Sequence, residues 1–168
     1  VNENALPKAW LIKETRLFDS PADMLRYMRS DQFDPANEAL MINNDKNETD
    51  SYSGQGAITL TGNTPNKLSF KVKLPEEQFV VFSEMYYPEG WSLKKDKVKI
   101  PIIKTNHALR GATLPAGEYA LDMIFHPASY FAGMGIVWIG DIIMLVLIGG
   151  SIMLNNRDKI FNRKKRND

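Results

Sequence analysis

Residues 67–85 read KLSFKVKLPEEQFVVFSEM, and this stretch decides the fold class. Every second residue from Leu68 to Leu74 is apolar and the residues between them are polar, which is the pattern of a strand with one buried and one solvated face. Gln78–Met85 is more continuously apolar, which predicts a strand in a central position. Two consecutive strands of different exposure indicate a mainly β domain.

Turn residues divide the surrounding sequence into further short segments of strand-like composition. With the two strands above, we expect about nine strands at the spacing of a β-sandwich. The additional strands are predicted at Ala9–Phe18, Glu38–Ile42, Ala57–Thr61, Trp91–Lys95, Val98–Ile103, Ala108–Leu114 and Glu118–Phe125. The predicted fold of residues 1–129 is therefore a β-sandwich of jelly-roll-like type.

Two segments near the start depart from this pattern. Ser20-Pro21-Ala22-Asp23 has a capping serine, a proline at the first helical position and an acidic residue in the first turn, which predicts a short helix that ends near Arg29. Residues 43–56 contain one aromatic and no aliphatic residue, which predicts a mobile loop. Asn47-Glu48-Thr49 in this loop fits the N-glycosylation acceptor pattern, although such tripeptides are common by chance.

A long apolar segment follows the β region. Phe131–Leu154 reads FAGMGIVWIGDIIMLVLIGGSIML and would form a helix of about 36 Å at ~1.5 Å per residue. A bilayer core is ~30 Å thick, whereas apolar core helices of soluble proteins seldom exceed about 14 residues. We therefore predict one C-terminal transmembrane helix over residues 130–154.

The flanks of this segment predict its orientation. Residues 155–168 carry six Lys or Arg, whereas residues 126–129 carry none. By the positive-inside rule, residues 155–168 form a basic cytoplasmic tail and residues 1–129 an extracytoplasmic domain. The tail would anchor the helix and contact anionic lipid headgroups of the bilayer. A net charge of +1 argues against a nucleic-acid partner.

The sequence contains few groups that could carry chemistry. It has no cysteine, and His107 and His126 are its two histidines, without ligand-forming residues nearby. It has no nucleophile elbow, phosphate-binding loop, dinucleotide fingerprint or zinc motif. We therefore predict no catalytic residue, no metal site and no cofactor in this chain.

Asp141 is the one charged residue in residues 130–154. An ionised carboxylate at the bilayer centre costs at least ~2.5–3.5 kcal/mol on insertion scales, so it should not face lipid. Gly133 and Gly140 lie on roughly one helix face and would let another transmembrane helix approach. We predict a polar contact between Asp141 and another helix. The alternative is that protonation and local water suffice.

Aromatic residues and one arginine gather in the second half of the β region. Tyr86-Tyr87-Pro88-Glu89-Gly90-Trp91 surrounds a tight turn, and Asn106-His107-Ala108-Leu109-Arg110-Gly111 follows a predicted hairpin. Arg110 is a candidate to bind a phosphate or carboxylate with paired hydrogen bonds, and a salt bridge to a turn glutamate is the alternative. Trp91 is either a sugar platform or a buried core anchor. Tyr87 and Asn106 complete the candidate ligand-binding set, and Asn106 is expected to bond backbone in a turn.

These segments carry a family resemblance. The order YYPEGW, IPI, N-x-x-L-R-G, P-A-G and F-x-P-x-x-Y-x-x-G before a terminal span resembles the C-terminal end of YfhO-like bacterial membrane proteins. The likeness is densest over residues 79–135, and NALPKAW and FDPANEAL resemble the same family. The hairpin turn departs from it, because relatives often have Asp-Gly where this chain has Asp96-Lys97.

The resemblance implies a polytopic parent of the GT-C glycosyltransferase type in the bacterial cytoplasmic (inner) membrane. Such a protein would use a polyprenyl-phosphate-linked sugar in cell-envelope glycosylation. This chain would be its last ectodomain and helix, which would cover the active site and help to bind the acceptor or the lipid-linked donor. Its partners would be the bilayer, the other transmembrane helices and an envelope polymer. The alternative is a non-catalytic, single-pass binding or assembly module of an envelope complex.

Overall fold

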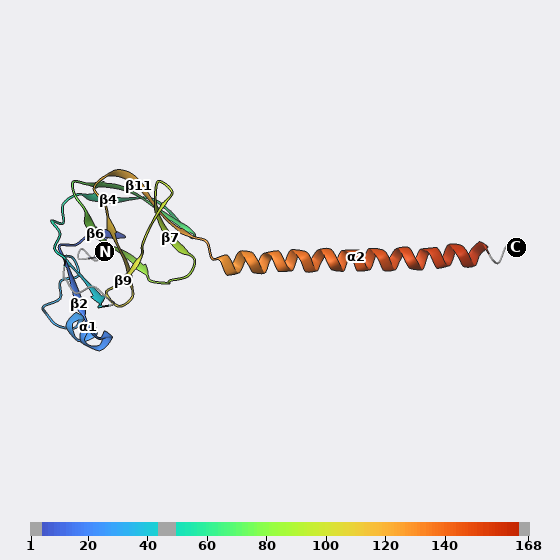
Figure 1. The fold of residues 1–168 in the computed structure, drawn as a ribbon, viewed down its shortest axis with the longest axis horizontal. Helices are drawn as coiled ribbons and strands as arrows, with labels where there is room; N and C mark the ends of the chain where they lie inside the picture. Colours follow the sequence, from blue (N-terminus) through green and yellow to red (C-terminus); the bar gives the residue numbers. More distant parts are fainter. Residues whose placement is uncertain (1–4, 44–49, 165–168) are drawn as a thin grey trace. The chain divides into compact units, whose positions relative to one another are not determined.

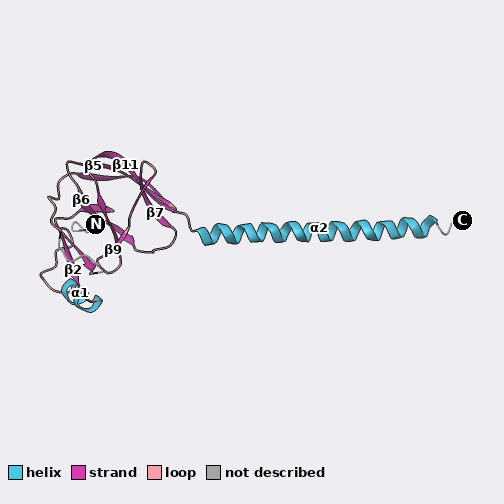
Figure 2. Ribbon diagram, viewed as in Figure 1, coloured by secondary structure: helices cyan, strands magenta, loops and turns pink. Residues whose placement is uncertain are grey.

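The structure is a computed structural model that describes residues 5–43 and 50–164, with side chains described up to residue 153. The chain divides into two compact units, Val1–His126 and Pro127–Asp168. Strands make up most of the first unit and one helix makes up the second (Figure 2). The prediction of a mainly β fold followed by an apolar C-terminal helix is confirmed.

Two antiparallel sheets pack face to face in the first unit (Figure 1). The outer sheet has the order β4 (Ala57–Thr64), β5 (Lys67–Leu74), β11 (Gly117–Phe125), β7 (Trp91–Lys95) and β8 (Val98–Ile100). The central sheet has the order β1 (Ala9–Leu11), β6 (Gln78–Met85), β10 (Leu109–Leu114) and β9 (Ile103–Thr105). The buried side chains of Phe70 and Val72 from the outer sheet meet those of Val80 and Phe82 from the central sheet. This is the sandwich core.

The central sheet is also covered on its other face. A parallel pair, β2 (Glu14–Phe18) and β3 (Glu38–Ile42), is joined by helix α1 (Pro21–Met28). We call β2, α1 and β3 the third layer. Ala39 and Met41 from this layer pack with Phe79 and Val81 of β6 in a second buried cluster. Because β6 is buried on both faces, its segment Phe79–Phe82 (FVVF) is continuously apolar rather than alternating.

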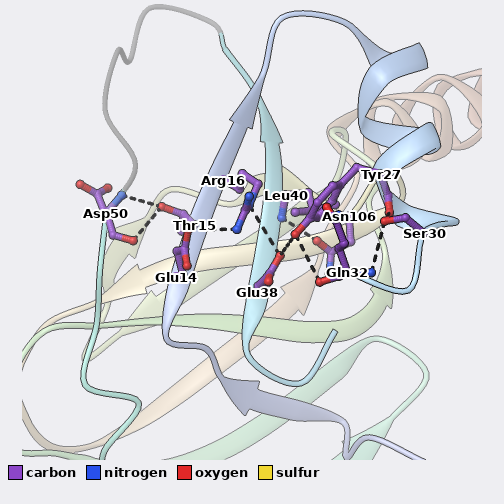
Figure 3. A network of polar contacts seen from close by, with 10 residues as sticks. All are labelled: Glu14, Thr15, Arg16, Tyr27, Ser30, Gln32, Glu38, Leu40, Asp50 and Asn106. Atoms are coloured by element: carbon purple, nitrogen blue, oxygen red, sulfur yellow. Dashed lines mark hydrogen bonds and ion pairs between the residues drawn. The ribbon is translucent and has the colours of Figure 1, made fainter. Parts of the chain in front are cut away.

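Polar contacts fix α1 to the parallel strands (Figure 3). Ser20 caps the helix, because its Oγ accepts a hydrogen bond from Asp23 N at 3.1 Å. The Tyr27 hydroxyl donates to Glu38 Oε2 at 2.9 Å, and Arg16 Nε lies 3.7 Å from the same carboxylate. The Arg16 guanidinium also stands over the Tyr27 ring, 4.8 Å from its centroid. These contacts hold the third layer together as a unit.

Strand boundaries differ from the prediction where the chain changes sheets. The predicted strand over residues 9–18 is split at Ile12-Lys13, because β1 pairs with β6 whereas β2 pairs with β3. The predicted strand over residues 98–103 is split beside Pro101, so that β8 lies in the outer sheet and β9 in the central sheet. Proline has no N–H to donate to a ladder, which favours an exit from the sheet. The described residues therefore contain eleven strands.

Residues 50–56 of the predicted loop make specific hydrogen bonds. Thr15 N donates to Asp50 O at 2.9 Å, and Tyr52 N donates to Lys13 O at 2.7 Å. Gly54 N donates to the buried Gln78 Oε1 at 2.9 Å. Residues 44–49, with the glycosylation tripeptide, lie outside the described residues.

The second unit is formed by helix α2 (Ala128–Lys164), which extends beyond the predicted end of the span. Its part Ala128–Met153 has a mean hydropathy of 2.3 and is long and apolar enough to cross a membrane. In the described part of the chain it is the one helix with these properties. A Cβ placed on Gly133 or Gly140 would have no heavy atom within 4 Å beyond the helix itself. Both glycines therefore leave room for a neighbouring helix.

Candidate functional site

The turn between β6 and β7 carries the aromatic cluster predicted from the sequence. Backbone hydrogen bonds tie it down at both ends, because Tyr86 N donates to Ala108 O and His126 N donates to Gly90 O, each at 2.6 Å. Gly90 has a φ of 85°, a left-handed conformation that an L side chain rarely adopts. The backbone of the turn is therefore held in place at both ends.

A cavity of about 310 Å³ opens beside this turn, and we call it the aromatic cavity. The rings of Tyr86, Tyr87 and Trp91 line it, together with Ser92 and Lys99. Its volume is at the lower end of the range for small-molecule sites. The three amphipathic rings can stack on a sugar ring, and the Ser92 hydroxyl and the Lys99 amine can form hydrogen bonds with its substituents.

Trp91 contacts one residue of its own sheet and one residue of the central sheet. It pairs in register with Phe125, and the two ring centroids are 5.1 Å apart. The Arg110 guanidinium carbon from β10 lies 4.2 Å from the Trp91 ring centroid. The indole is half-buried. Trp91 therefore packs against the sandwich core without being buried in it, and it also lines the aromatic cavity. Its role as a sugar platform stays a prediction.

Arg110 is a buried cation without a buried counter-ion. It is 3% exposed, its Nη1 donates to Met123 Sδ at 3.1 Å, and its Nε has no hydrogen-bond partner among the described residues. Burial lowers the pKa of the guanidinium, and the negative charge of Glu84 opposes this effect. No described carboxylate forms an ion pair with it, so the structure does not contain the salt bridge considered as the alternative. Arg110 contacts the Trp91 ring but is not among the described residues that line the aromatic cavity.

Asn106 belongs to a different part of the unit. Its Oδ1 accepts a hydrogen bond from Leu40 N at 2.7 Å, and its own N donates to Leu40 O at 2.8 Å (Figure 3). The residue is 5% exposed and has a φ of 46°, which asparagine tolerates better than most residues. Asn106 therefore bonds backbone from a turn and joins the central sheet to β3 of the third layer. Of the four predicted ligand-binding residues, the structure places Tyr87 and Trp91 at one cavity.

A larger cavity, of about 540 Å³, was not predicted from the sequence, and we call it the layer cavity. Its walls come from the third layer, from β6 and from β9 and β10. It shares Tyr86 and Ile102 with the aromatic cavity. No pattern in the sequence indicated this cavity, because its walls are distant along the chain. Among the described residues, no group of three or more His, Cys, Asp or Glu could hold a metal ion.

Comparisons with protein-family models, with curated proteins and with solved structures give no match to this chain.

Proposed function

We propose that residues 1–129 form an extracytoplasmic binding domain that helix α2 anchors in the cytoplasmic membrane of a bacterium. Its parent is a YfhO-like, GT-C-type glycosyltransferase that uses a polyprenyl-phosphate-linked sugar in cell-envelope glycosylation. The domain covers the membrane-embedded active site and helps to bind the acceptor or the donor. The order of the sequence motifs supports the parent, and the aromatic cavity supports the binding role.

The observation that carries the binding role is the convergence of Tyr86, Tyr87 and Trp91 on one cavity with Lys99. Tyr87 is 55% exposed, so its ring is free to stack on a ligand. In the described residues no ion pair engages Lys99, and its amine can bond a sugar hydroxyl or a phosphate oxygen. Arg110 supports the cavity through the Trp91 ring rather than by direct contact with the ligand.

Binding can be tested on the full chain in nanodiscs. A Trp10→Phe, Trp138→Phe background leaves Trp91 as the sole indole, whose emission reports on the aromatic cavity. The probes are methyl hexosides, hexose 1-phosphates and a citronellyl-phosphate-linked hexose. We expect at least one probe to shift the emission, and Tyr87→Ala to weaken that response about tenfold, as expected for one stacking contact. Tyr130→Ala is the control, since Tyr130 is similarly exposed but lies in α2. If no probe shifts the emission, the binding role is wrong.

The membrane orientation has its own test. Single cysteines at Ser53 and Asn162 would be labelled with a membrane-impermeant maleimide in intact cells, with the outer membrane permeabilised if there is one. We expect labelling at position 53 and none at position 162. The reverse pattern would place the domain in the cytoplasm and overturn the proposal.

The second candidate is a single-pass binding or assembly module without an enzymatic parent. Asp141 favours a partner helix under both candidates. It lies in the apolar segment Ala128–Met153 of α2, which is not buried against the rest of the described chain. The coding sequence upstream of Val1 separates the two candidates. Many hydrophobic spans support the glycosyltransferase parent, whereas a lone signal peptide supports the module.

A further inference from the structure

We infer that the layer cavity binds a single-chain amphiphile with an anionic head group. This inference goes beyond the proposed function and does not depend on it, because it concerns a different cavity and a different class of ligand. The cavity, of about 540 Å³, is within the range of sites that enclose small molecules.

The apolar part of the layer cavity is suited to a flexible hydrocarbon chain. Met24 from α1, Met41 from β3 and Phe79 from β6 contribute side chains to its walls, with Leu17 and Ile103. Methionine is unbranched and polarizable, so two methionines from different elements can adjust to a chain of variable conformation. A sugar in this place would leave most of its hydroxyl groups without partners, at a cost of about 1–3 kcal/mol for each buried group.

The polar groups of the layer cavity form two sets, and the first consists of Asp50, Tyr52 and Thr113. Burial of Tyr52 raises its pKa, and the side chains of Asp50 and Thr113 lie close enough to influence it. Asp50 is fixed by its backbone, which exchanges hydrogen bonds with Thr15. Asp50 is therefore held beside Tyr52 in this part of the cavity.

The second set is Lys104 and His107, and neither forms an ion pair with a described carboxylate. Both side chains are exposed and line the layer cavity. The backbone of His107 is held next to Asn106, whose side chain is bonded to Leu40. An anionic head group at this place would complete a charge-assisted hydrogen bond with the Lys104 amine.

The test uses the full chain with ¹³C-methyl methionine in nanodiscs of zwitterionic lipid, titrated with octanoate. We expect the methyl signals of Met24 and Met41 to shift, because both side chains line the layer cavity. Met123 in the sandwich core should not shift, and Met144 in α2 reports any partition of octanoate into the bilayer. If the Met24 and Met41 signals stay unchanged while Met144 responds, the cavity binds no amphiphile. If they shift with protein concentration alone, a second copy occupies the cavity and the inference is wrong.

Two variants test the head group and the chain separately. Lys104→Gln should weaken octanoate binding about tenfold, as expected for one charge-assisted hydrogen bond, and leave octanol binding unchanged. Ile103→Trp should abolish the binding of both probes by filling the cavity, and an unchanged Met123 signal shows that the variant is folded. Lys99→Gln is the matched control, because Lys99 lines the aromatic cavity instead. Equal loss of octanoate and octanol binding in Lys104→Gln would overturn the assignment of an anionic head group.

Discussion

Gly111 occupies a position in β10 where even a methyl group does not fit. A Cβ built on it would lie 2.6 Å from both Cε1 and Cζ of Phe79 and 3.1 Å from Thr105 Cγ2. Favourable carbon–carbon contacts begin at about 3.5 Å, so the ring would have to move by nearly 1 Å. Phe79 is 1% exposed and packs on Tyr52, with ring centroids 6.2 Å apart. Its displacement therefore disturbs the second buried cluster.

We expect Gly111→Ala to destabilise the first unit by about 2–3 kcal/mol, the upper part of the range for overpacking a core. Gly62→Ala is the matched control, because a Cβ on Gly62 in β4 would meet Ser69 Cβ at an ordinary 3.5 Å. Gly62 does not have a left-handed backbone. Its substitution should leave stability unchanged or raise it by up to about 1 kcal/mol, since alanine restricts the unfolded chain.

A double-mutant cycle with Phe79→Leu tests the stated cause. Phe79→Leu alone should cost about 1–2 kcal/mol, because it removes buried ring atoms. The double variant should be at least ~1 kcal/mol more stable than the sum of the single effects, since leucine vacates the space that the alanine needs. The assay is urea unfolding of the full chain in detergent micelles, followed by Trp10 fluorescence in a Trp91→Phe, Trp138→Phe background. Strictly additive effects would refute the steric explanation. So would a Gly111→Ala variant whose stability lies within 0.5 kcal/mol of the unsubstituted protein, since this is about the error of additivity.

Three further predictions follow from other positions. Asp96 and Lys97 have φ values of 47° and 78°, so Lys97→Gly should stabilise the hairpin by about 1 kcal/mol in the same unfolding assay, and Lys97→Val should destabilise it. Burial raises the pKa of Tyr119 from 10.0 to about 12, while its hydroxyl donates to Pro115 O at 2.8 Å. The folded state therefore favours the neutral phenol, so this stabilisation is complete below pH 10 and is lost between pH 10 and about 12; an absorbance titration at 295 nm should show a tyrosine that titrates near pH 12 and is missing in Tyr119→Phe. If Asp141 contacts another helix, Asp141→Leu should lower the thermal stability of the protein in detergent, and unchanged or improved stability would exclude such a contact.

The β fold was predictable because its signals are local. Alternation in residues 67–74 and continuous apolarity in residues 78–85 identify β5 and β6, whose bounds agree with the prediction. The sheet changes at Ile12-Lys13 and Pro101 were not predictable, because they depend on which distant strand each segment pairs with. The third layer was missed as a layer for the same reason, although its helix and β3 were both expected.

The candidate site was predictable only as far as its residues are neighbours in the sequence. Tyr87 and Trp91 lie four positions apart in one turn, and both line the aromatic cavity. Arg110 was chosen for its charge, but its burial against Trp91 and Met123 depends on how two sheets stack. The layer cavity could not be found, because Met24, Met41 and Phe79 each look like an ordinary core residue in isolation.

The pairing of β1 with β6 has a consequence for biosynthesis. Trp10 pairs with Val81, so the first strand has no partner until most of the domain has been synthesised. The hairpins β4–β5 and β7–β8 close over short turns and can form within about 1–10 μs, whereas pairings of large sequence separation are slow. The third layer, which packs on the β1–β6 pair, should therefore be the last part to fold. Pulsed hydrogen exchange during refolding should protect the amides of β5 before those of β3, and simultaneous protection would show that the three layers form as one unit.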